Sequence, residues 1–159
     1  MTIAVGDKIP QATLNIFKDG VQAVSTDDVF AGKKVVLFAV PGAFTPTCSA
    51  KHLPGFVQHM DQFRERGVEV ACLSVNDAFV MGAWAKDQDV PDDISMLADG
   101  NGSLTEAMGL EMDGTAFGLG KRSKRYALVA DDGVVKQLFV DAPGEFKVSS
   151  AEHVLSEMR

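Results

Sequence analysis

Residues 35–40 form an unbroken apolar run, VVLFAV, that constrains the fold more than any other stretch. Two lysines precede the run, and Pro41 and Gly42 follow it. A short apolar run with such flanks is typical of a strand that is buried on both faces, which is the central strand of an α/β sheet. Ligands of open α/β sheets bind beyond the carboxyl ends of the strands, so we expect the chemistry in the loop that follows residue 40.

That loop contains Cys48, and a helical pattern of apolar residues begins just after it. The first N–H groups of a helix have no intrahelical partner and carry partial positive charge, which favours an anionic sulfur over a neutral thiol. Cysteines are usually packed core residues, but Cys48 lies among Pro, Gly and Thr residues rather than in an apolar run. The sequence therefore predicts a thiolate nucleophile at this position.

A strand, a helix and a second strand are expected between residues 35 and 75. The apolar positions after Cys48 recur at helical spacing as far as Phe63. Pro54 predicts a kink in this helix, because it has no N–H for the helical hydrogen bond and its ring crowds the preceding turn. Residues 68–75 have the composition of a second buried strand, so the unit is a crossover between two parallel strands.

Turn and capping signals predict the other elements. Before the central strand they are a hairpin of residues 12–17 and 21–24 and one helical turn at 26–30. After the crossover they are a helix capped by Asn76 or Asp77 with Phe79, Val80, Ala83 and Trp84 on its inner face, a strand at 94–98, a helix with a capping box at 103–106, a mobile, irregular loop at 114–120, a hairpin of 125–130 and 134–140, and a terminal helix with a capping box at 149–152.

The segment around Cys48 resembles the active site of a known family. It reads PGAFTPTCS and continues as HLPGF, which is similar to the type II peroxiredoxins, the class that includes the atypical fifth mammalian form. The similarity resumes at residues 72–80 (CLSVNDAFV) and at 124–126 (KRY), so it spans most of the chain. These motifs are long and specific, whereas a bare Thr-x-x-Cys occurs by chance in many loops.

The order of elements and the resemblance both indicate a thioredoxin-like α/β fold, with a central mixed β-sheet, flanking helices and an N-terminal β-hairpin. The chain has 159 residues, the usual size of one domain, so residues 1–159 are interpreted as a single thioredoxin-like peroxiredoxin domain. The resemblance implies a thiol peroxidase that reduces hydrogen peroxide and alkyl hydroperoxides. Its thiolate becomes a sulfenic acid, which a thiol reductant then restores. No cofactor is expected.

Thr45 and Arg125 are the expected catalytic partners of Cys48. Thr45 stands three residues before Cys48, where its hydroxyl cannot form a disulfide but can hydrogen-bond to the sulfur or to a peroxide oxygen; a helix-capping role is compatible with the same place. Arg125 belongs to a basic run that could be a solvated surface. The family places its active-site arginine in the matching Lys-Arg-aromatic sequence, where it would stabilise the thiolate and the leaving oxygen. By resemblance, Pro41 shields the sulfur from water.

Substrate binding is expected from an apolar collar over the sulfur, although aromatic residues are more often simply core. By resemblance to the family's pocket, its members are Phe44, Phe79, Phe117 and Leu119. His52 lies one helical turn after Cys48 and is interpreted as a packed or hydrogen-bonded residue behind the site. A lone Cys-His pair without a second pair at ligand spacing predicts no metal site.

Cys72 decides how the oxidised enzyme is reduced. It lies three residues before the end of the strand at 68–75, roughly 10 Å below the edge where Cys48 is expected, whereas a disulfide needs Cα atoms within about 7 Å. We therefore expect a one-cysteine cycle completed by glutathione or glutaredoxin. The alternative is thioredoxin acting on a Cys48–Cys72 disulfide, since some plant relatives keep a cysteine resembling Cys72. Residues 148–150 lack the resolving cysteine that other type II members carry near the C-terminus.

Two functions of other kinds remain open. One is a Cys-His hydrolase or transferase that uses His52 or His153 as its base, although no Asn or Asp partner is evident. The other is a thioredoxin-like binding or holdase module with an incidental thiol, whose activity the substitution Cys48→Ser would leave unchanged.

Charge and composition bear on partners and compartment. The net charge of −7 argues against general affinity for nucleic acid or anionic membranes. No apolar run approaches the roughly 18 residues of a membrane-spanning helix, and the first residues lack the pattern of a secretory signal. Two cysteines without CxxC spacing fit a reducing compartment. We expect a cytoplasmic protein, and the resemblance implies a homodimer.

Overall fold

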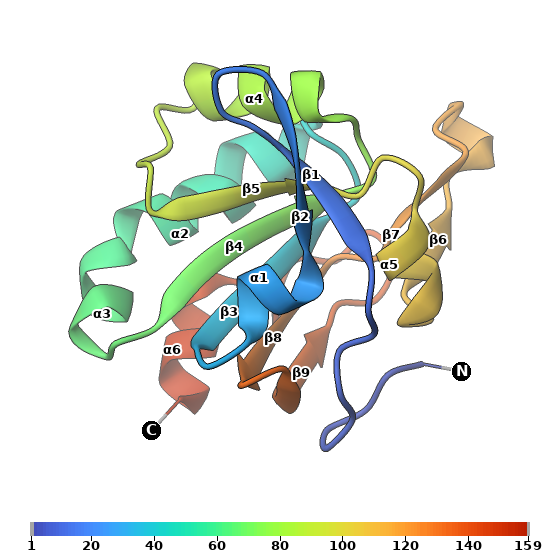
Figure 1. Ribbon diagram of the computed structural model, residues 1–159. Coiled ribbons are helices and arrows are strands. Elements are labelled where there is room, and N and C mark those ends of the chain that lie inside the picture. Colours follow the sequence, from blue (N-terminus) through green and yellow to red (C-terminus); the bar gives the residue numbers. More distant parts are fainter. Residues whose placement is uncertain (1, 159) are drawn as a thin grey trace.

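The computed structural model describes residues 2–158, which fold around one seven-stranded mixed β-sheet (Figure 1). Its central strand, β3 (Lys34–Val40), pairs in parallel with β4 (Glu69–Ser74) and antiparallel with β8 (Tyr126–Asp131). The outer strands are β5 (Ile94–Ala98), β9 (Val134–Val140), and the hairpin of β1 (Thr13–Phe17) and β2 (Val21–Ser25). Their order is β2-β1-β5-β4-β3-β8-β9. The predicted mixed sheet and N-terminal hairpin are confirmed.

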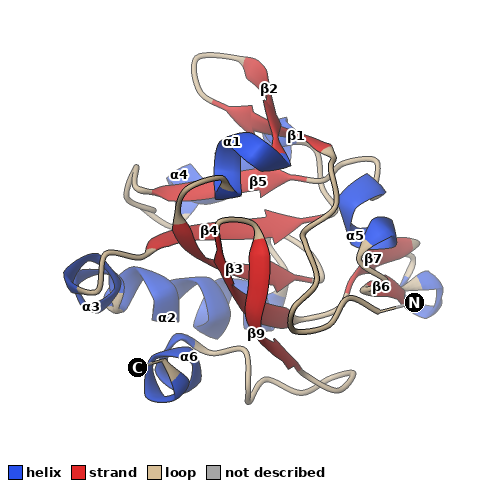
Figure 2. Ribbon diagram, turned by 60° about the horizontal axis from the view of Figure 1, so that its bottom comes forward, coloured by secondary structure: helices blue, strands red, loops and turns tan. Residues whose placement is uncertain are grey.

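Helices cover both faces of this sheet (Figure 2). One face carries α2 (Leu53–Gln58), α3 (Met60–Glu65), α4 (Ala78–Asp87) and α6 (Ala151–Glu157). The other carries α1 (Thr26–Phe30) and α5 (Ser103–Ala107). A π-helical turn, Cys48–His52, precedes α2. Within residues 2–158, no helix has both the length and the apolar composition needed to span a membrane.

The central strand is buried on both faces, as its apolar run predicts. Side chains alternate along a strand, so Val36, Phe38 and Val40 pack under α2, α4 and α6, while those of residues 35, 37 and 39 pack under α1 and α5. None of these six side chains is more than 1% exposed. Full burial of an aliphatic or aromatic side chain contributes about 1.5–3 kcal/mol each, so this strand anchors both layers of the core.

The topology brings four chain segments to one edge of the sheet. The parallel strands β3 and β4 both end there, so residues 41–48 and Asn76 lie close together. The antiparallel strand β8 begins at the same edge, and β9 ends beside it, where Asp141 N donates to Arg125 O at 2.9 Å. Cys48, Arg125 and Asp141 therefore meet although they lie far apart in the sequence.

The helix after Cys48 is irregular, but not at the predicted point. A π-helical turn replaces a kink at Pro54: Leu53 N bonds to Cys48 O, five residues back. The wider turn lies just before Pro54, which has no N–H to donate, and moves the preceding carbonyls away from its ring. A second break, not predicted, separates α2 from α3 at His59, where the backbone leaves helical geometry.

The predicted inner face of α4 is wrong in part. Asp77 caps the helix as expected, accepting a hydrogen bond from Val80 N. Ala78, Met81 and Trp84 point into the core, whereas Phe79 and Ala83 are exposed. Residues at steps of three share a helix face, so the buried Trp84 selects Met81 and Ala78 as its neighbours and turns Phe79 outward.

Three smaller predictions are also corrected. Residues 111–123 are a hairpin of β6 (Glu111–Asp113) and β7 (Lys121–Ser123) around a 3₁₀ turn, Thr115–Phe117, rather than an irregular loop. Helix α5 starts after Gly102, and its first N–H groups bond to the Asp99 carboxylate instead of a capping box. Helix α6 is capped by Ser150, because the Ser149 hydroxyl donates to the Asp141 carboxylate instead.

Candidate active site

Cys48 lies in the first turn of the helical segment that follows β3. Pro46 and Thr47 are already helical, and the first helical hydrogen bond runs from Ser49 N to Thr45 O at 2.9 Å. The backbone N–H groups of the residues before Ser49 have no acceptor within the helix and carry the partial positive charge of a helix start. The Cys48 side chain is fully buried. The setting matches the predicted place for a thiolate.

The loop between β3 and Cys48 is held in one shape by its own contacts. Asn76, at the end of β4, accepts a hydrogen bond from Ala43 N at 3.0 Å. Thr45 Oγ1 donates to Gly42 O at 2.6 Å. Phe44 adopts a left-handed backbone with φ +63°, which is strained for a bulky residue. Strain of this kind persists only where surrounding contacts fix the backbone. The strained residue, Phe44, lies four residues before Cys48.

Arg125, the residue before β8, is the direct partner of the sulfur. Its Nη2 donates to Cys48 Sγ at 3.1 Å, and its Nη1 donates to His52 Nδ1 at 2.8 Å. Its guanidinium carbon also lies 5.8 Å from the centre of the Phe146 ring, a cation–π distance. A planar guanidinium can donate to the sulfur and to the histidine at once, which a lysine ammonium in its place could not do with the same geometry.

His52 is a neutral hydrogen-bonding residue at this site. Its Nε2 lies 3.0 Å from Ser149 O, a carbonyl that can only accept, so Nε2 carries the proton and Nδ1 accepts from Arg125. Burial, and then the charge of Arg125, lower the pKa of His52 to about 3. Because its one free lone pair is already occupied, His52 is not available as a general base.

Asp141 fixes the segment that holds His52. Its carboxylate accepts hydrogen bonds from the backbone N–H groups of residues 147, 148 and 149 and from the Ser149 hydroxyl. Burial acts to raise the pKa of Asp141, but these hydrogen bonds, led by that of the Ser149 side chain, lower it overall. A continuous chain of contacts therefore runs from Asp141 through Ser149 and His52 to Arg125 and the sulfur.

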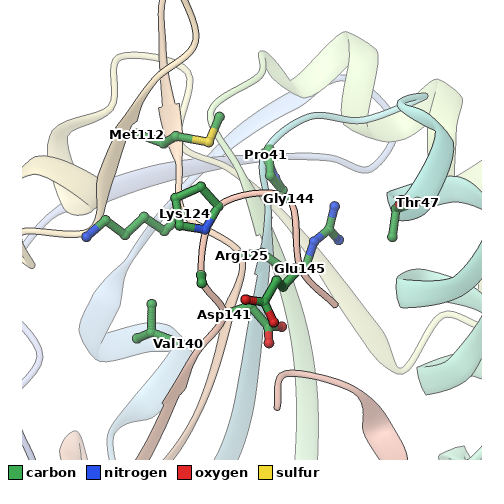
Figure 3. Close-up of a pocket in the computed structure, with 11 residues that line it drawn as sticks. Pro41, Thr47, Met112, Lys124, Arg125, Val140, Asp141, Gly144 and Glu145 are labelled. Carbon is green, nitrogen blue, oxygen red and sulfur yellow. The ribbon is translucent and has the colours of Figure 1, made fainter. Parts of the chain in front are cut away.

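A cavity of about 420 Å³ opens beside this chain of contacts (Figure 3). Pro41, Thr47 and Arg125, the hydrogen-bond partner of Cys48, contribute to its wall. The other lining residues are Met112, Lys124, Val140, Asp141, Ala142, Pro143, Gly144 and Glu145. The volume is within the usual range for small-ligand sites.

The chain is similar in sequence to known proteins and similar in fold to solved structures. Residues 4–155 match the redoxin family. The chain is 54% identical to Peroxiredoxin-2E-2, chloroplastic, of Oryza sativa subsp. japonica, over 99% of this chain and 73% of that protein. It is 48% identical to Peroxiredoxin-2B of Arabidopsis thaliana over 98% of both. The crystal structure of reduced Prx3 in complex with hydrogen peroxide from Vibrio vulnificus has a TM-score of 0.93 and 54% identity, covering 98% of each chain. The chain belongs to the type II peroxiredoxins.

The predicted family, the thioredoxin-like fold and the activity are thereby confirmed. This peroxiredoxin is a thiol peroxidase, an oxidoreductase that reduces peroxides at the expense of a thiol.

The peroxiredoxin's predicted residues are only partly brought together. Pro41 and Arg125 line the cavity, and His52 lies behind Arg125. Among residues 2–158, no hydrogen bond joins the side chains of Thr45 and Cys48; the Thr45 hydroxyl proton is directed at Gly42 O. The four predicted collar residues do not line this cavity. Phe44, Phe79 and Phe117 are 52%, 67% and 84% exposed, and Leu119 is half-buried.

Cys72 lies inside β4, opposite Phe38 in the register of the sheet. Both cysteines of the peroxiredoxin are free thiols in the structure and belong to the same core cluster. Complete burial, and then the proximity of Cys48, raise the pKa of Cys72 well above its ordinary value.

The sequence analysis did not predict several residues that shape this site. Asn76 was expected only as a helix cap, and Asp141 and Ser149 act through contacts between distant segments. Arg122, one residue of the basic run, donates from Nε to Leu119 O at 3.0 Å and lies beside Pro41 O. A polar residue directly after a strand end, such as Asp141, is the one local signal that could have been used.

Proposed function

We propose that Cys48 is the nucleophile of this thiol peroxidase and that Arg125 stabilises its charge. The observation that carries the proposal is the 3.1 Å hydrogen bond from Arg125 Nη2 to Cys48 Sγ at a helix start. Two sources of positive charge, the guanidinium and the free N–H groups of the first turn, converge on one sulfur. That arrangement suits a thiolate rather than a packed neutral thiol.

In the proposed reaction the Cys48 thiolate attacks one peroxide oxygen in line with the O–O bond. The bond breaks, the leaving oxygen takes a proton to become water or an alcohol, and Cys48 becomes a sulfenic acid. Arg125 stabilises the charge that develops on the departing oxygen. Thr45 accepts a hydrogen bond from the peroxide hydroxyl, because its own proton is held by Gly42 O. Pro41 limits the access of water from the cavity side.

His52 and Asp141 are proposed as positioning residues. They keep the guanidinium in place through Ser149 and do not touch the peroxide. This arrangement disfavours the rival Cys-His hydrolase with His52 as base, since His52 accepts a hydrogen bond from Arg125 and has no free lone pair for a proton. His153 packs its ring edge-on against Phe139, on the outer helix α6.

We further propose a one-cysteine cycle in which glutathione or glutaredoxin reduces the sulfenic acid. Attack on that acid requires a thiolate, and the buried Cys72 has a raised pKa within a regular strand. A Cys48–Cys72 disulfide reduced by thioredoxin would require the π-helical turn Cys48–His52 to unwind. Reduction by an external thiol does not require a thiolate at Cys72 or a Cys48–Cys72 disulfide.

A homodimer is proposed because large aromatic side chains are exposed on the surface. Phe44 is in the active-site loop, Phe79 follows the cap of α4, and Phe117 is at the tip of the β6–β7 hairpin. Exposed apolar groups of this size mark interaction surfaces, and a second copy of the chain could complete the predicted collar. We propose the cytoplasm as the compartment, since two free thiols suit reducing conditions.

Mass spectrometry after one equivalent of peroxide tests the assignment of the nucleophile. One added oxygen is expected on Cys48 and none on Cys72. The variant Cys48→Ser should remain folded and lose peroxide turnover with every thiol donor. Turnover near the wild-type rate in that variant would show that the thiol is incidental, as in a binding or holdase module.

A further inference from the structure

Arg122 connects two parts of the molecule that are far apart in the sequence. It is the middle residue of β7, in the two-stranded β6–β7 hairpin that projects beside the main sheet (Figure 1). Its side chain reaches the loop after β3, where its Nη1 lies 3.5 Å from Pro41 O. That loop leads to Cys48, so Arg122 links an outlying hairpin to the segment that carries the proposed nucleophile.

The hairpin fixes one end of this link. Arg122 Nε donates a hydrogen bond to Leu119 O at 3.0 Å. Leu119 N in turn donates to Gly114 O at 3.0 Å, and Gly114 N donates to Gly120 O at 2.6 Å. A Cβ atom added at Gly114 would lie only 2.8 Å from Leu119 Cβ, so the turn is closely packed. The carbonyl that holds the guanidinium therefore belongs to a turn with one defined shape.

The other end of the guanidinium packs against Gly42. A Cβ atom added at Gly42 would lie 2.9 Å from Arg122 Nη1 and 3.1 Å from Thr45 Cγ2. Gly42 does not have a positive φ angle, so a glycine is needed here for space and not for its backbone conformation. The contact from Arg122 to Pro41 O is long for a hydrogen bond. The close packing at Gly42 is the observation that carries the inference.

This packing bears on Thr45, because Gly42 is also the hydrogen-bond acceptor of Thr45. Thr45 Oγ1 donates to Gly42 O at 2.6 Å, so a movement of Gly42 would turn the Thr45 hydroxyl. No carboxylate competes for the guanidinium: in the part of the chain that the structure describes, Arg122 forms no salt bridge, whereas its neighbour Lys121 pairs with Glu111 at 3.7 Å.

We propose that Arg122 is a positioning residue for peroxide reduction. It holds Gly42 in place, and Gly42 holds the Thr45 proton, so that a lone pair of the Thr45 oxygen is left for the peroxide hydroxyl. Arg122 acts through these two residues and not on the sulfur, whose hydrogen-bond donor is Arg125. The inference rests on the proposed function, in which Thr45 accepts a hydrogen bond from the peroxide.

Two substitutions disturb the packing at Gly42, one from each partner. Arg122→Met removes the guanidinium and keeps a long apolar side chain, and Gly42→Ala adds a methyl group where Arg122 Nη1 lies. Each should slow the oxidation of Cys48 by hydrogen peroxide by about tenfold to 100-fold, measured by stopped flow without a thiol donor, because small misplacements of reacting groups have effects of this size. Alkylation of Cys48 by iodoacetamide, which uses the thiolate but not Thr45, should keep its wild-type rate.

A double-mutant cycle with Thr45→Val tests whether Arg122 acts through the Thr45 hydroxyl. Thr45→Val should itself slow oxidation. In that background Arg122→Met should add no more than about a twofold loss, which is within the usual error of additivity. Lys121→Met is the matched control, because it removes a cation from the same strand without touching the loop, and it should be oxidised at the wild-type rate.

Several outcomes would overturn the proposal. They are a wild-type oxidation rate in either folded variant or in Thr45→Val, an equal slowing of alkylation, an equal loss in Lys121→Met, and an effect of Arg122→Met that is the same with and without the Thr45 hydroxyl. Gly42→Ala, alone and with Thr45→Val, decides the matter if Arg122→Met does not fold. Cys48→Ser, which should give no peroxide-dependent signal, tests the proposed nucleophile by itself, so the two proposals can fail separately.

Discussion

Replacing Arg125 by alanine tests the central contact of the site. The substitution removes the donor at 3.1 Å from Cys48 Sγ and the donor at 2.8 Å from His52 Nδ1. Loss of one preorganised donor to developing charge costs about 2.7–4 kcal/mol of the barrier, which is on the order of 100- to 1,000-fold in rate. The His52 nitrogen also loses its partner in a buried setting, which lowers the free energy of unfolding by about 1–3 kcal/mol.

The oxidation step can be followed directly through the one tryptophan of the chain, Trp84. Its indole Nε1 donates to Ser49 Oγ at 3.0 Å, and Ser49 follows Cys48 in the same helical turn. Stopped-flow fluorescence with excess peroxide should therefore give a second-order rate constant for the oxidation of Cys48 without any thiol donor. Cys48→Ser, which should give no peroxide-dependent signal, is the control.

Arg125→Lys separates charge from geometry in the same assay. A lysine keeps the positive charge but has a single ammonium in place of the fork, so it cannot serve both Cys48 and His52 as the guanidinium does. Its rate constant should fall between those of wild type and Arg125→Ala. The reasoning fails if folded Arg125→Ala is oxidised within tenfold of the wild-type rate, because the contact to the sulfur would then be structural only.

Three further predictions concern the surroundings of this contact. Cys72→Ser should keep full turnover with glutathione and glutaredoxin, and loss of turnover with every donor in a folded variant would contradict the one-cysteine cycle. His52 is neutral when folded, with a pKa of about 3 against 6.5 when unfolded. Below pH 6.5 the unfolded state therefore binds more protons than the folded state, and the free energy of unfolding decreases as the pH is lowered. Urea unfolding should show wild type losing about 2 kcal/mol more than His52→Gln between pH 8 and pH 5, and equal losses would be evidence against the buried neutral ring. Asp141→Asn removes an acceptor for residues 147–149, so it should slow Cys48 oxidation by loosening Arg125; an unchanged rate with lowered stability would limit Asp141 to a structural role.

The parts of the fold that the sequence predicted well are those set by local chemistry. Residues 35–40 are apolar on both faces of a strand and could be buried only between two layers, which is what β3 shows. The hairpin of β8 and β9 follows from Asp132 and Gly133, whose φ angles of +49° and +78° suit the tight turn. The place of Cys48 at a helix start was predictable for the same reason, because a helical pattern after a buried strand is visible in the sequence itself.

Features that depend on how distant segments meet were not predictable in this way. Asp141 reaches Ser149, and through it His52, only because β9 ends beside the start of β8 and the chain then returns along the same edge. No local pattern specifies that return. The prediction of the inner face of α4 was wrong in part for a related reason. Phe79 and Trp84 are both large and apolar, so the local sequence does not show which of them is buried. The hydrogen bond from Trp84 to Ser49, on another helix, is among the contacts that decide it.

The neutrality of His52 explains how one guanidinium can serve two partners. If the ring were protonated, Nδ1 would become a donor, and Arg125 would face a positive charge where it now has an acceptor at 2.8 Å. Arg125 would then keep only the sulfur contact and lose the support that fixes its orientation. Burial of His52, reinforced by the charge of Arg125, holds its pKa near 3 and so keeps the acceptor in place throughout the neutral range. The sulfur thus depends on a histidine whose function at this site is to remain uncharged.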